Sequence, residues 1–567
     1  MNAPAVHKYD LIVVGAGAGG MVTALCAAHL GLRVLLCEAS GHAGGTTALS
    51  AGTLWVPGNS ASLEAGHEDS VADAQRYLDA VIGPEDPRGL REAFLESSAD
   101  AIDFLAERTE VQFAPAGLHP DYLQSDGAAL AGRALAPLPY DGRKLGKDFG
   151  HIHPPLPDFT ILGGMMVGKR DVQALVGRYQ SWDNFLHVMR ILGRHALDRV
   201  THQRGTRLVM GNALVARCLA SLRAAKVDLR YRSRLTELLQ TDGEVVGARF
   251  ETDEGVFTCH ARHGVVLATG GIGHHAELRA RLSQGMPHWG SLLPQGIRGA
   301  GLQHAMEIGA RLDEHPVNFF WQPVSRVPTP DGYRLFPHLY LDRAKPGIIA
   351  INGAGLRFTN EADSYHHFAA SLWSHMRSNE PPAFLVCDAE FIRRYGVGAI
   401  PPGTKNTRQY EAGGYILQAD TLQNLATKMG VPADTLISSI DRYNISANTG
   451  KDSDWGKGES PLNCFNGDPD HTPNPCLGPI QQAPFYALPI WPADAGSSAG
   501  LATDCHGRVL NDNDDVIKGL FAAGNDMASP MRGTYPGPGI TLGPAVTFAY
   551  RIARHIANRA ESQQNRS

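Results

Sequence analysis

Long apolar runs, a targeting signal and clustered positive charge are all missing from this sequence of 567 residues. No stretch reaches the roughly 18 consecutive apolar residues that a membrane-spanning helix needs. The opening residues, MNAPAVHK, are too few and too polar for a signal peptide. These absences predict a cytoplasmic protein with no transmembrane segment, and they leave peripheral contact with a membrane open.

Excess positive charge, metal-ligand spacing and paired cysteines are missing as well. The chain has 51 Lys and Arg against 57 Asp and Glu, and no basic block or stripe, which argues against a nucleic-acid partner. The 24 histidines include no H-E-x-x-H spacing, which predicts no metal. None of the eight cysteines forms a C-x-x-C, so we expect reduced and mostly buried thiols.

The length and composition indicate more than one globular domain. A chain of 567 residues with 43% hydrophobic and 19% charged residues exceeds a single compact core. No internal repeat or low-complexity segment is found. Residues 60–225 look mainly helical around a Pro/Gly-rich loop at 114–168, whereas residues 326–495 are richer in Pro, Tyr and His and irregular patterns.

Alternating patterns and turn signals predict further elements between and after these regions. VDLRYRS, RLTELLQ, VVGARFET and GVFTCHA alternate apolar and polar residues, with Asp-Gly and Glu-Gly turns, and predict an antiparallel meander. GVVLATGGIG reads as a buried strand, and residues 300–315 as a helix. The C-terminal part reads as the strand GLFAAG, a glycine loop and a helix from about 543, whereas the glycine-rich stretch 43–59 predicts no regular structure.

The N-terminal residues carry a dinucleotide-binding pattern. Residues 9–38 read as strand, tight turn, helix and strand, and the turn satisfies G-x-G-x-x-G. Gly15 permits the turn, Gly17 lets the backbone approach a pyrophosphate, and Gly20 lets helix and strand pack closely. Ala18 and Gly19 lie at the helix N-terminus, whose free N–H groups favour phosphate. Glu38, at the end of the second strand, would accept hydrogen bonds from the adenosine ribose.

NAD and FAD share this fingerprint, so the choice between them depends on other loops. Three glycine-rich segments far apart in the sequence favour FAD, because its isoalloxazine ring needs additional loops to cover it. The residues predicted to contribute are Gly44, Gly45, Thr46, Thr47, Ser50, Ala51 and Gly52 in the first segment, Ala268, Thr269 and Gly270 in the second, and Gly524, Asn525 and Asp526 in the third.

These segments resemble the fumarate reductase/3-ketosteroid dehydrogenase superfamily of FAD enzymes. The resemblance implies that Gly524 and Asp526 meet the ribityl-pyrophosphate. It also implies that the amides near Thr541 and Leu542, at a helix N-terminus, face the flavin N1/O2 edge and stabilise the reduced anion. Members with covalent flavin carry a histidine within the loop that here reads Gly45-Thr46-Thr47. His42 lies upstream of it, so we expect non-covalent FAD.

A sharper resemblance is to 3-ketosteroid Δ1-dehydrogenases and related cyclic-ketone desaturases. Four segments carry it, in order along nearly the whole chain: HPDY ending at Tyr122, RGTRLVMGNALVARCLASL at 204–222, PGIIAINGAGLRFTNEADSY ending at Tyr365, and TYPGPGITLGPA at 534–545. The fold that this implies is α/β, a Rossmann-type FAD-binding domain (residues 1–325 and 496–567) with an inserted α+β catalytic domain at 326–495 that caps the substrate.

The resemblance also assigns chemistry to the tyrosines. Desaturation beside a ketone removes a proton from the α-carbon and a hydride from the β-carbon. The Tyr535 hydroxyl and the Gly539 N–H would hold the carbonyl oxygen as an oxyanion-hole pair. Tyr365 would be the base, and since a tyrosine with a pKa near 10 is a poor base at neutral pH, Tyr122 would share or relay its proton. Flavin N5 would take the hydride.

Two departures and two alternatives accompany this hypothesis. Ketosteroid dehydrogenases follow the equivalent of Tyr486 with a segment that ends in Gly-Gly, where this chain has 492–500, PADAGSSAG, and Arg532 directly precedes the tyrosine loop. The first alternative is a fumarate reductase-like enoate reductase that uses Arg343, Arg357 or Arg532. The second is a non-catalytic flavin-binding redox partner. No second dinucleotide fingerprint is evident, which favours a quinone-type electron acceptor over NAD(P)H.

Overall fold

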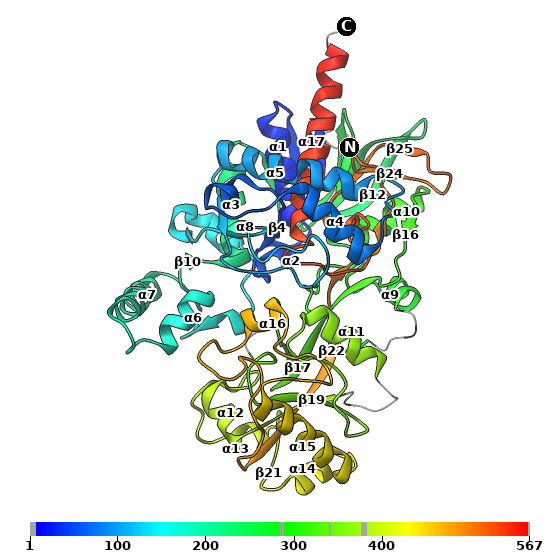
Figure 1. The fold of residues 1–567 in the computed structure, drawn as a ribbon. Coiled ribbons are helices and arrows are strands. Elements are labelled where there is room, and N and C mark those ends of the chain that lie inside the picture. The colour runs from blue at the N-terminus through cyan, green and yellow to red at the C-terminus, as the bar shows by residue number, and fades with distance from the viewer. Residues whose placement is uncertain are drawn as a thin grey trace.

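A six-stranded sheet organises the part of the chain that is drawn uppermost in Figure 1 and that we call the upper body. In this computed structural model, residues 7–283, 285, 288–339, 342–375, 381 and 383–564 are described. In spatial order the strands are β11 (Asp228–Arg230), β3 (Val34–Cys37), β2 (Leu11–Val14), β15 (Val265–Leu267), β25 (Val516–Ala522) and β24 (Arg508–Leu510). All neighbours are parallel except β24, which is antiparallel to β25. The fully buried run LIVV of β2 is typical of a strand with both faces covered.

The predicted meander is mostly correct. β12 (Arg234–Thr241), β13 (Glu244–Thr252) and β14 (Gly255–Ala261) pair antiparallel, and β1 (His7–Tyr9) adds to β14 in parallel. The prediction for VDLRYRS, however, is wrong: this segment forms strand β11, which pairs in parallel with β3 rather than with the meander. An alternating pattern gives no information about the pairing partner, and β11 lies at the sheet edge, where one face stays partly open.

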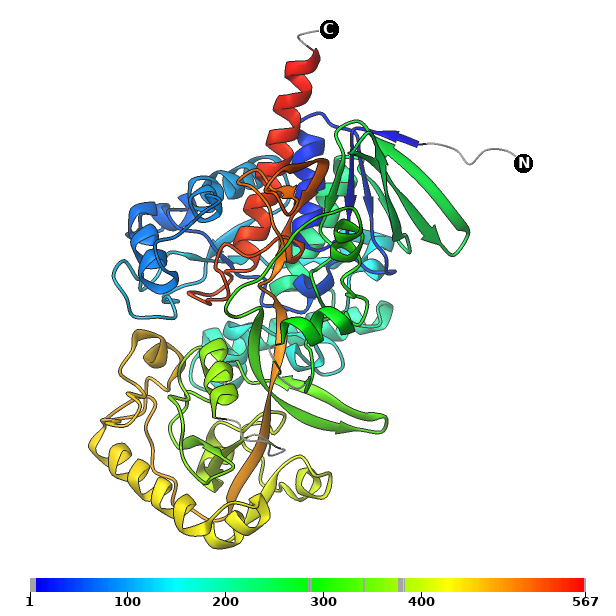
Figure 2. The same cartoon turned by 90° about the vertical axis from the view of Figure 1, so that its right-hand side faces the viewer.

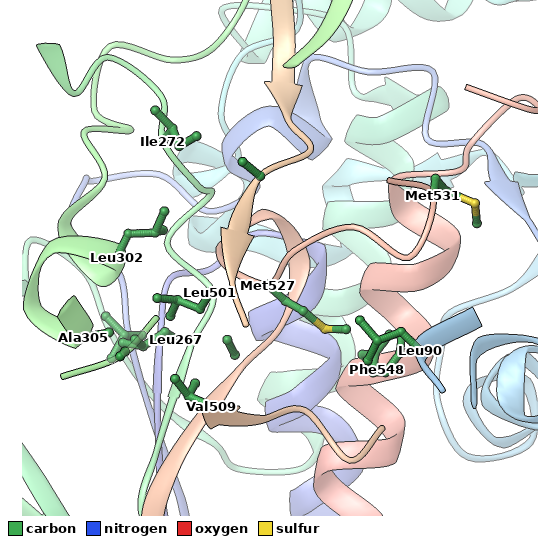
Figure 3. Close-up of a cluster of buried hydrophobic side chains, with 14 of the residues drawn as sticks. Leu90, Leu267, Ile272, Leu302, Ala305, Leu501, Val509, Met527, Met531 and Phe548 are labelled. Atoms are coloured by element: carbon green, nitrogen blue, oxygen red, sulfur yellow. The ribbon is translucent and has the colours of Figure 1, made fainter. Parts of the chain in front are cut away.

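Helices cover the parallel sheet. α1 (Ala18–His29) is buried over most of its length because it packs against α8 (Met210–Ala224) and the long C-terminal helix α17 (Leu542–Gln564), which also contacts α5 (Leu90–Arg108). Figure 3 shows one part of this core. Leu267 from the central sheet lies there with Leu501, with Met527 and with Phe548, of which only Phe548 belongs to α17. Segments from both ends of the chain therefore build one core.

Shorter elements surround this core. The 43–59 stretch, expected to be irregular, contains the short helix α2 (Gly45–Ala48) and the strand β4 (Leu54–Trp55), which pairs with β6. The other helices and strands of the upper body are α3 (Ser60–Glu64), α4 (Val71–Ile82), β5 (Phe113–Pro115), β6 (Ala134–Pro137), β7 (Tyr140–Asp141), β8 (Thr160–Ile161), β9 (Met165–Met166), α6 (Lys169–Val176), α7 (Trp182–Thr201), β10 (Arg207–Leu208), α9 (Ala276–Leu282), α10 (Ala300–Glu307), β16 (Leu312–Asp313) and β23 (Gly500–Leu501). Among the described residues, 3₁₀ helices span Gly142–His151, Pro157–Phe159 and Gly524–Asp526.

A second, mainly antiparallel sheet organises the lower part. Its order is β18 (Gly332–Pro337), β17 (Phe319–Thr329), β22 (Phe485–Ser497), β20 (Ala383–Asp388) and β19 (Ile348–Asn352), and β21 (Leu417–Ala419) also pairs with β22. The helices around it are α11 (Tyr365–Ser374), α12 (Ala389–Arg394), α13 (Arg408–Ala412), α14 (Leu422–Met429), α15 (Ala433–Thr449) and α16 (Pro461–Asn466).

The two parts are joined by paired strands. Figure 2 shows β22 running the length of the lower part towards the upper sheet, and its C-terminal half pairs with β17. The domain limits expected at 325/326 and 495/496 fall inside β17 and β22, so each limit would cut a strand rather than a loop. We therefore keep the two-domain division as a proposal and place the connection in this strand pair.

No helix among the described residues is both long enough and apolar enough to span a bilayer. Of the cysteines, six are buried, Cys505 is half-buried and Cys464 is exposed, and all are free thiols.

Candidate active site

The glycines of the first loop have two different surroundings. A Cβ at Gly15 would lie 2.2 Å from the Ala268 carbonyl oxygen, and one at Gly20 would lie 1.8 Å from the Gly15 carbonyl oxygen. These two glycines permit close backbone packing. A Cβ at Gly17, in contrast, would meet no atom within 4 Å. Gly17 therefore faces open space at the N-terminus of α1, where a phosphate group is stabilised.

The loops predicted to share the nucleotide lie together. Gly19 lies against the C-terminal loop, since its Cβ would be 3.2 Å from the Gly524 nitrogen. The Thr47 hydroxyl accepts from the Ala18 N–H at 3.2 Å. A Cβ at Gly45 or Gly524 would also meet nothing within 4 Å. Three glycines from three distant segments thus leave a common polar cradle, which fits an extended pyrophosphate such as that of FAD.

The remaining residues of the 44–52 segment shape this cradle. The Gly44 N–H donates to the Ala16 carbonyl, and the Ser50 hydroxyl donates to the Thr47 carbonyl while it accepts from the Gly52 N–H. Ala51 is exposed, whereas Thr46 is half-buried.

Glu38 supports the first loop directly. Its two carboxylate oxygens accept from the N–H groups of Ala16 at 2.8 Å and Ser40 at 2.9 Å. Because each oxygen has a second lone pair, a ribose hydroxyl can still be bound there.

Asp526 has a structural contact that the sequence did not indicate. It is fully buried and accepts from the Thr269 N–H at 2.5 Å, the Thr269 hydroxyl at 3.0 Å and the Gly271 N–H at 2.7 Å. Burial raises the pKa of this carboxyl, and the same N–H donors oppose the shift. Asp526 thus fixes the loop of Ala268, Thr269 and Gly270 against the C-terminal loop next to Asn525.

Gly17→Ala should separate cofactor binding from folding. The added methyl meets no protein atom but enters the space assigned to the pyrophosphate, so we expect the variant to fold yet lose most of its FAD. The control is Gly150→Ala, where a Cβ also meets nothing within 4 Å. FAD per protein and the far-UV circular dichroism spectrum measure the two effects. Full FAD content in Gly17→Ala would contradict the placement.

Three tyrosines from distant segments meet in one cluster. The ring centroids of Tyr365 and Tyr535 are 5.1 Å apart, those of Tyr122 and Tyr365 are 5.8 Å apart, and those of Tyr122 and Tyr535 are 5.9 Å apart. All three are buried. Tyr365 is the first residue of α11. The hydroxyl of the N-cap residue Ser364 accepts from the His367 N–H, and this hydrogen bond fixes the start of the helix at Tyr365. The structure thus brings together the three residues that the resemblance proposed.

The Tyr535 hydroxyl is a protonated donor over a wide pH range. Burial raises the pKa of Tyr535 to about 12, although hydrogen bonds with the side chains of Tyr365 and Thr541 oppose the shift. The Tyr365 and Tyr535 hydroxyls are therefore in direct contact. A carbonyl oxygen that enters here would meet a neutral phenol, which donates.

A buried network holds the Tyr122 loop against the Tyr535 loop. The Pro536 carbonyl accepts from the Tyr122 N–H at 2.8 Å and from the Tyr77 hydroxyl at 2.6 Å. Asp121, adjacent to Tyr122, accepts from the Trp55 indole at 2.7 Å and from Arg133 at 2.6 Å. Replacement of these partners would release the loop that positions Tyr122.

Gly539 has the free backbone donor that its proposed role requires. Its φ of +92° lies in the left-handed region, and a Cβ there would be 2.3 Å from the Thr53 carbonyl oxygen. The Gly539 carbonyl accepts from the Trp55 N–H at 3.2 Å. Among the hydrogen bonds of the described residues, none uses the Gly539 N–H as donor. Helix α17 begins three residues after Gly539, at Leu542, and Thr541 directly precedes it.

Sequence reasoning missed two neighbours of Tyr535. His366 stacks on the Tyr535 ring at 5.6 Å, and Phe320 meets it edge-on at 5.4 Å. Phe320 also lines a small cavity with Ser497, Gly524, Asn525, Ile540 and Thr541, so it connects the tyrosine cluster to the cofactor loops. The position of His366 next to Tyr365 was the available signal for the histidine. Phe320 lies in the aromatic run Phe319-Phe320-Trp321, and nothing in that run distinguishes it from core residues.

His366 should make stability depend on pH. Its Nδ1 accepts from the Trp321 N–H at 3.1 Å, and burial lowers the pKa of His366 to about 3. In the unfolded chain the His366 imidazole takes up a proton near pH 6.5, whereas in the folded chain it stays neutral down to about pH 3. The free energy of unfolding therefore falls as the pH decreases from 6.5 towards 3. Between pH 7 and 5 we expect His366 to contribute a loss of about 2 kcal/mol. In His366→Gln that loss should be absent, as measured by urea unfolding at both pH values.

The half-buried His67, outside the cluster, is the control: His67→Gln should lose as much stability on acidification as the wild type. If His366→Gln loses as much unfolding free energy between pH 7 and 5 as the wild type, the claim that His366 is a buried neutral imidazole is refuted.

Comparison with known proteins gives a consistent result. The family described as "FAD binding domain" matches residues 10–542. The chain belongs to this FAD-binding family. A "3-oxosteroid 1-dehydrogenase" of Mycolicibacterium smegmatis is 35% identical over 98% of this chain and 99% of its own length. A "4-oxocyclohex-2-ene-1-carboxylate 5-dehydrogenase" of Sinomonas cyclohexanicum is 34% identical over 98% and 95%.

A solved structure agrees with the fold. The 3-ketosteroid Δ1-dehydrogenase of Sterolibacterium denitrificans, solved in complex with 1,4-androstadiene-3,17-dione, superposes with a TM-score of 0.89 at 33% identity over 98% of this chain and 100% of its own. The family resemblance, the fold class and FAD as the cofactor are thus confirmed for this FAD-binding family member.

Proposed function

We propose that this protein is an FAD-dependent dehydrogenase that introduces an α,β double bond beside the carbonyl of a cyclic ketone. The observation that supports it most is the cluster of three buried tyrosines, in which Tyr535 lies in the same loop as the free N–H of Gly539. The names of the relatives extend from steroids to cyclohexene carboxylates, so the substrate class is a 3-ketosteroid or a smaller cyclohexanone-type ketone.

The chain's own residues would activate the α-proton. The carbonyl oxygen accepts from the Tyr535 hydroxyl and the Gly539 N–H, which stabilise the negative charge of the developing enolate. Tyr365 then takes the α-proton, and its contact with Tyr122 gives that proton a second acceptor. Burial excludes water, so these hydrogen bonds act in a low dielectric.

The cofactor supplies the acceptor for the β-hydride when it is bound. We propose that the loops containing Gly17, Thr47, Thr269, Gly524 and Thr541 hold it without a covalent bond. A quinone-type compound as the final electron acceptor and a cytoplasmic location are further parts of the proposal.

An enoate reductase of the fumarate reductase type is the weaker candidate because its arginines are engaged elsewhere. Arg343 is buried and donates to the carbonyls of His338, Leu339 and Glu361. Arg357 pairs with Glu361 and Asp452, both at 2.8 Å. Arg532 donates to the Glu85 carbonyl.

A flavin assay tests the proposal against both alternatives. The oxidised holoenzyme is mixed without oxygen with saturated cyclic ketones, from cyclohexanone to a 3-ketosteroid, and the visible flavin absorbance is followed. We expect at least one ketone to bleach it. Reoxidation of the reduced enzyme by fumarate, without bleaching by any ketone, would support the reductase. A flavin that responds to neither would support a non-catalytic redox partner.

A further inference from the structure

The C-terminal half of helix α17 lines a cavity that the proposed chemistry does not use. Its volume is about 520 Å³, within the range of about 300–1,000 Å³ that is typical of small-molecule sites. In Figures 1 and 2 this half of α17 points away from the lower part of the molecule. None of the described residues that line the cavity belongs to the tyrosine cluster or to the cofactor loops. The cavity is therefore separate from the candidate active site.

The lining of this cavity is strongly cationic. It contains the arginines Arg551, Arg554 and Arg559 and the histidines His506 and His555, and among the described lining residues there is no carboxylate. Positive charge also stabilises the C-terminal end of a helix, but that effect is confined to the last turn. All three arginines lie before the last turn of α17, which ends at Gln564. The helix dipole therefore does not account for the cluster.

Arg551 is held in place by neutral groups. Its Nε donates to the Cys505 carbonyl at 2.9 Å, and its Nη1 donates to the Ser97 hydroxyl at 2.5 Å. The carboxylate of Glu96 is 3.6 Å from the guanidinium and exposed, so that water screens the pair. Arg551 thus presents a fixed positive charge at the cavity.

Arg554 and Arg559 keep more of their donors for a ligand. Arg554 donates to the Tyr550 hydroxyl at 3.0 Å and lies over the Tyr550 ring, which leaves its charge without a carboxylate. Within the described part of the chain, no hydrogen bond or ion pair engages the Arg559 side chain. Both side chains are exposed and can turn towards a molecule in the cavity.

Two stacked histidines complete the cluster. The ring centroids of His506 and His555 are 4.5 Å apart. The Nε2 atom of His555 is buried, and no group of the described residues forms a hydrogen bond with it. Burial, followed by the neighbouring charges of His506, Arg508 and Arg559, lowers the pKa of His555 to about 4. Because buried polar atoms in proteins are almost always hydrogen-bonded, this nitrogen indicates a partner that is not part of the chain.

We propose that this cavity binds a small anion that carries at least two phosphate groups. Guanidinium groups match phosphate oxygens in charge and in hydrogen-bond geometry, and the His555 Nε2 atom supplies a further hydrogen bond. The lining positions on α17 extend from Arg551 to Ser562, a length of about 16 Å along the helix, which a single phosphate would not cover. This inference does not depend on the proposed function.

Titration calorimetry tests the inference on protein fully loaded with FAD, so that the cofactor's own phosphate site is filled. The probes are inorganic phosphate, pyrophosphate and ADP. We expect one pyrophosphate to bind per chain and inorganic phosphate to bind at least about tenfold more weakly, because it reaches fewer donors. ADP that binds more tightly than pyrophosphate would support a nucleotide as the ligand, and equal binding of the two would support an inorganic diphosphate.

The double variant Arg554→Gln, Arg559→Gln should bind pyrophosphate on the order of 100-fold more weakly. Each arginine contributes a hydrogen bond between charged groups, which is worth about tenfold in affinity or more. FAD content and far-UV circular dichroism show that the variant is folded.

The matched control removes two positive charges elsewhere. Arg298 and Arg408 are exposed and lie outside the cavity, so Arg298→Gln, Arg408→Gln changes the net charge equally and should bind pyrophosphate like the wild type. The inference is overturned if the wild type does not bind pyrophosphate, if inorganic phosphate binds as tightly as pyrophosphate, or if the two double variants lose affinity equally.

Discussion

Tyr535→Phe should lower kcat with a saturated cyclic ketone by about 10²–10³-fold, because it removes one of two donors to the enolate oxygen. The pKa of about 12 means that the wild-type hydroxyl stays protonated and donating at any pH at which the enzyme is assayed. The ring contacts with Tyr365, Phe320 and His366 persist in the variant, so FAD content should stay unchanged. Thermal stability should fall only slightly, because the buried hydroxyl's hydrogen bonds with Tyr365 and Thr541 are lost.

The matched control for this variant is Tyr486→Phe. Tyr486 is as buried as Tyr535 but lies in the core of the lower part, where its hydroxyl is 3.4 Å from that of Thr407. It should keep kcat within a factor of a few. Wild-type turnover in Tyr535→Phe, or an equal loss in both variants, would remove the oxyanion role.

Tyr365→Phe should be at least as damaging, since it removes the proposed base. Loss of a positioned base typically costs about 10²–10⁴-fold in rate. The measurement is exchange of the substrate α-hydrogen with deuterium from solvent, followed by mass spectrometry, together with kcat. We expect both to fall, because proton removal precedes or accompanies hydride loss.

Deuterium exchange distinguishes the proposed role of Tyr365 as the base from that of Tyr535 as a hydrogen-bond donor. Tyr365→Phe should abolish exchange, whereas Tyr535→Phe, which retains the base and the Gly539 N–H, should slow it without abolishing it. Wild-type exchange in Tyr365→Phe would mean that another group removes the α-proton and would require a new assignment of the base.

The cofactor part of the fold could be predicted because its signals are local. The spacing of Gly15, Gly17 and Gly20 and the acid at Glu38 describe one short unit, and the structure has β2, α1 and β3 there. The pairing partners of the strands could not be predicted in the same way. VDLRYRS alternates like its neighbours, yet β11 joins the parallel sheet, since the partner of an edge strand depends on tertiary packing.

The geometry of the candidate site also depends on tertiary contacts that the local sequence does not show. Tyr122, Tyr365 and Tyr535 were brought together by resemblance to a family, and no pattern in the sequence gives their distances. His366 and Phe320 carry no motif, because they act through contacts with a ring far away in the chain.

Product analysis after a single turnover tests the central claim most directly. Oxidised holoenzyme and a saturated cyclic ketone are mixed without oxygen, and the bleached flavin and the ketone product are quantified together. The account predicts one ketone product two hydrogens lighter, with its double bond α,β to the carbonyl, for each flavin bleached. Flavin that stays oxidised with every ketone of the panel, or bleaching without an unsaturated ketone, would contradict it.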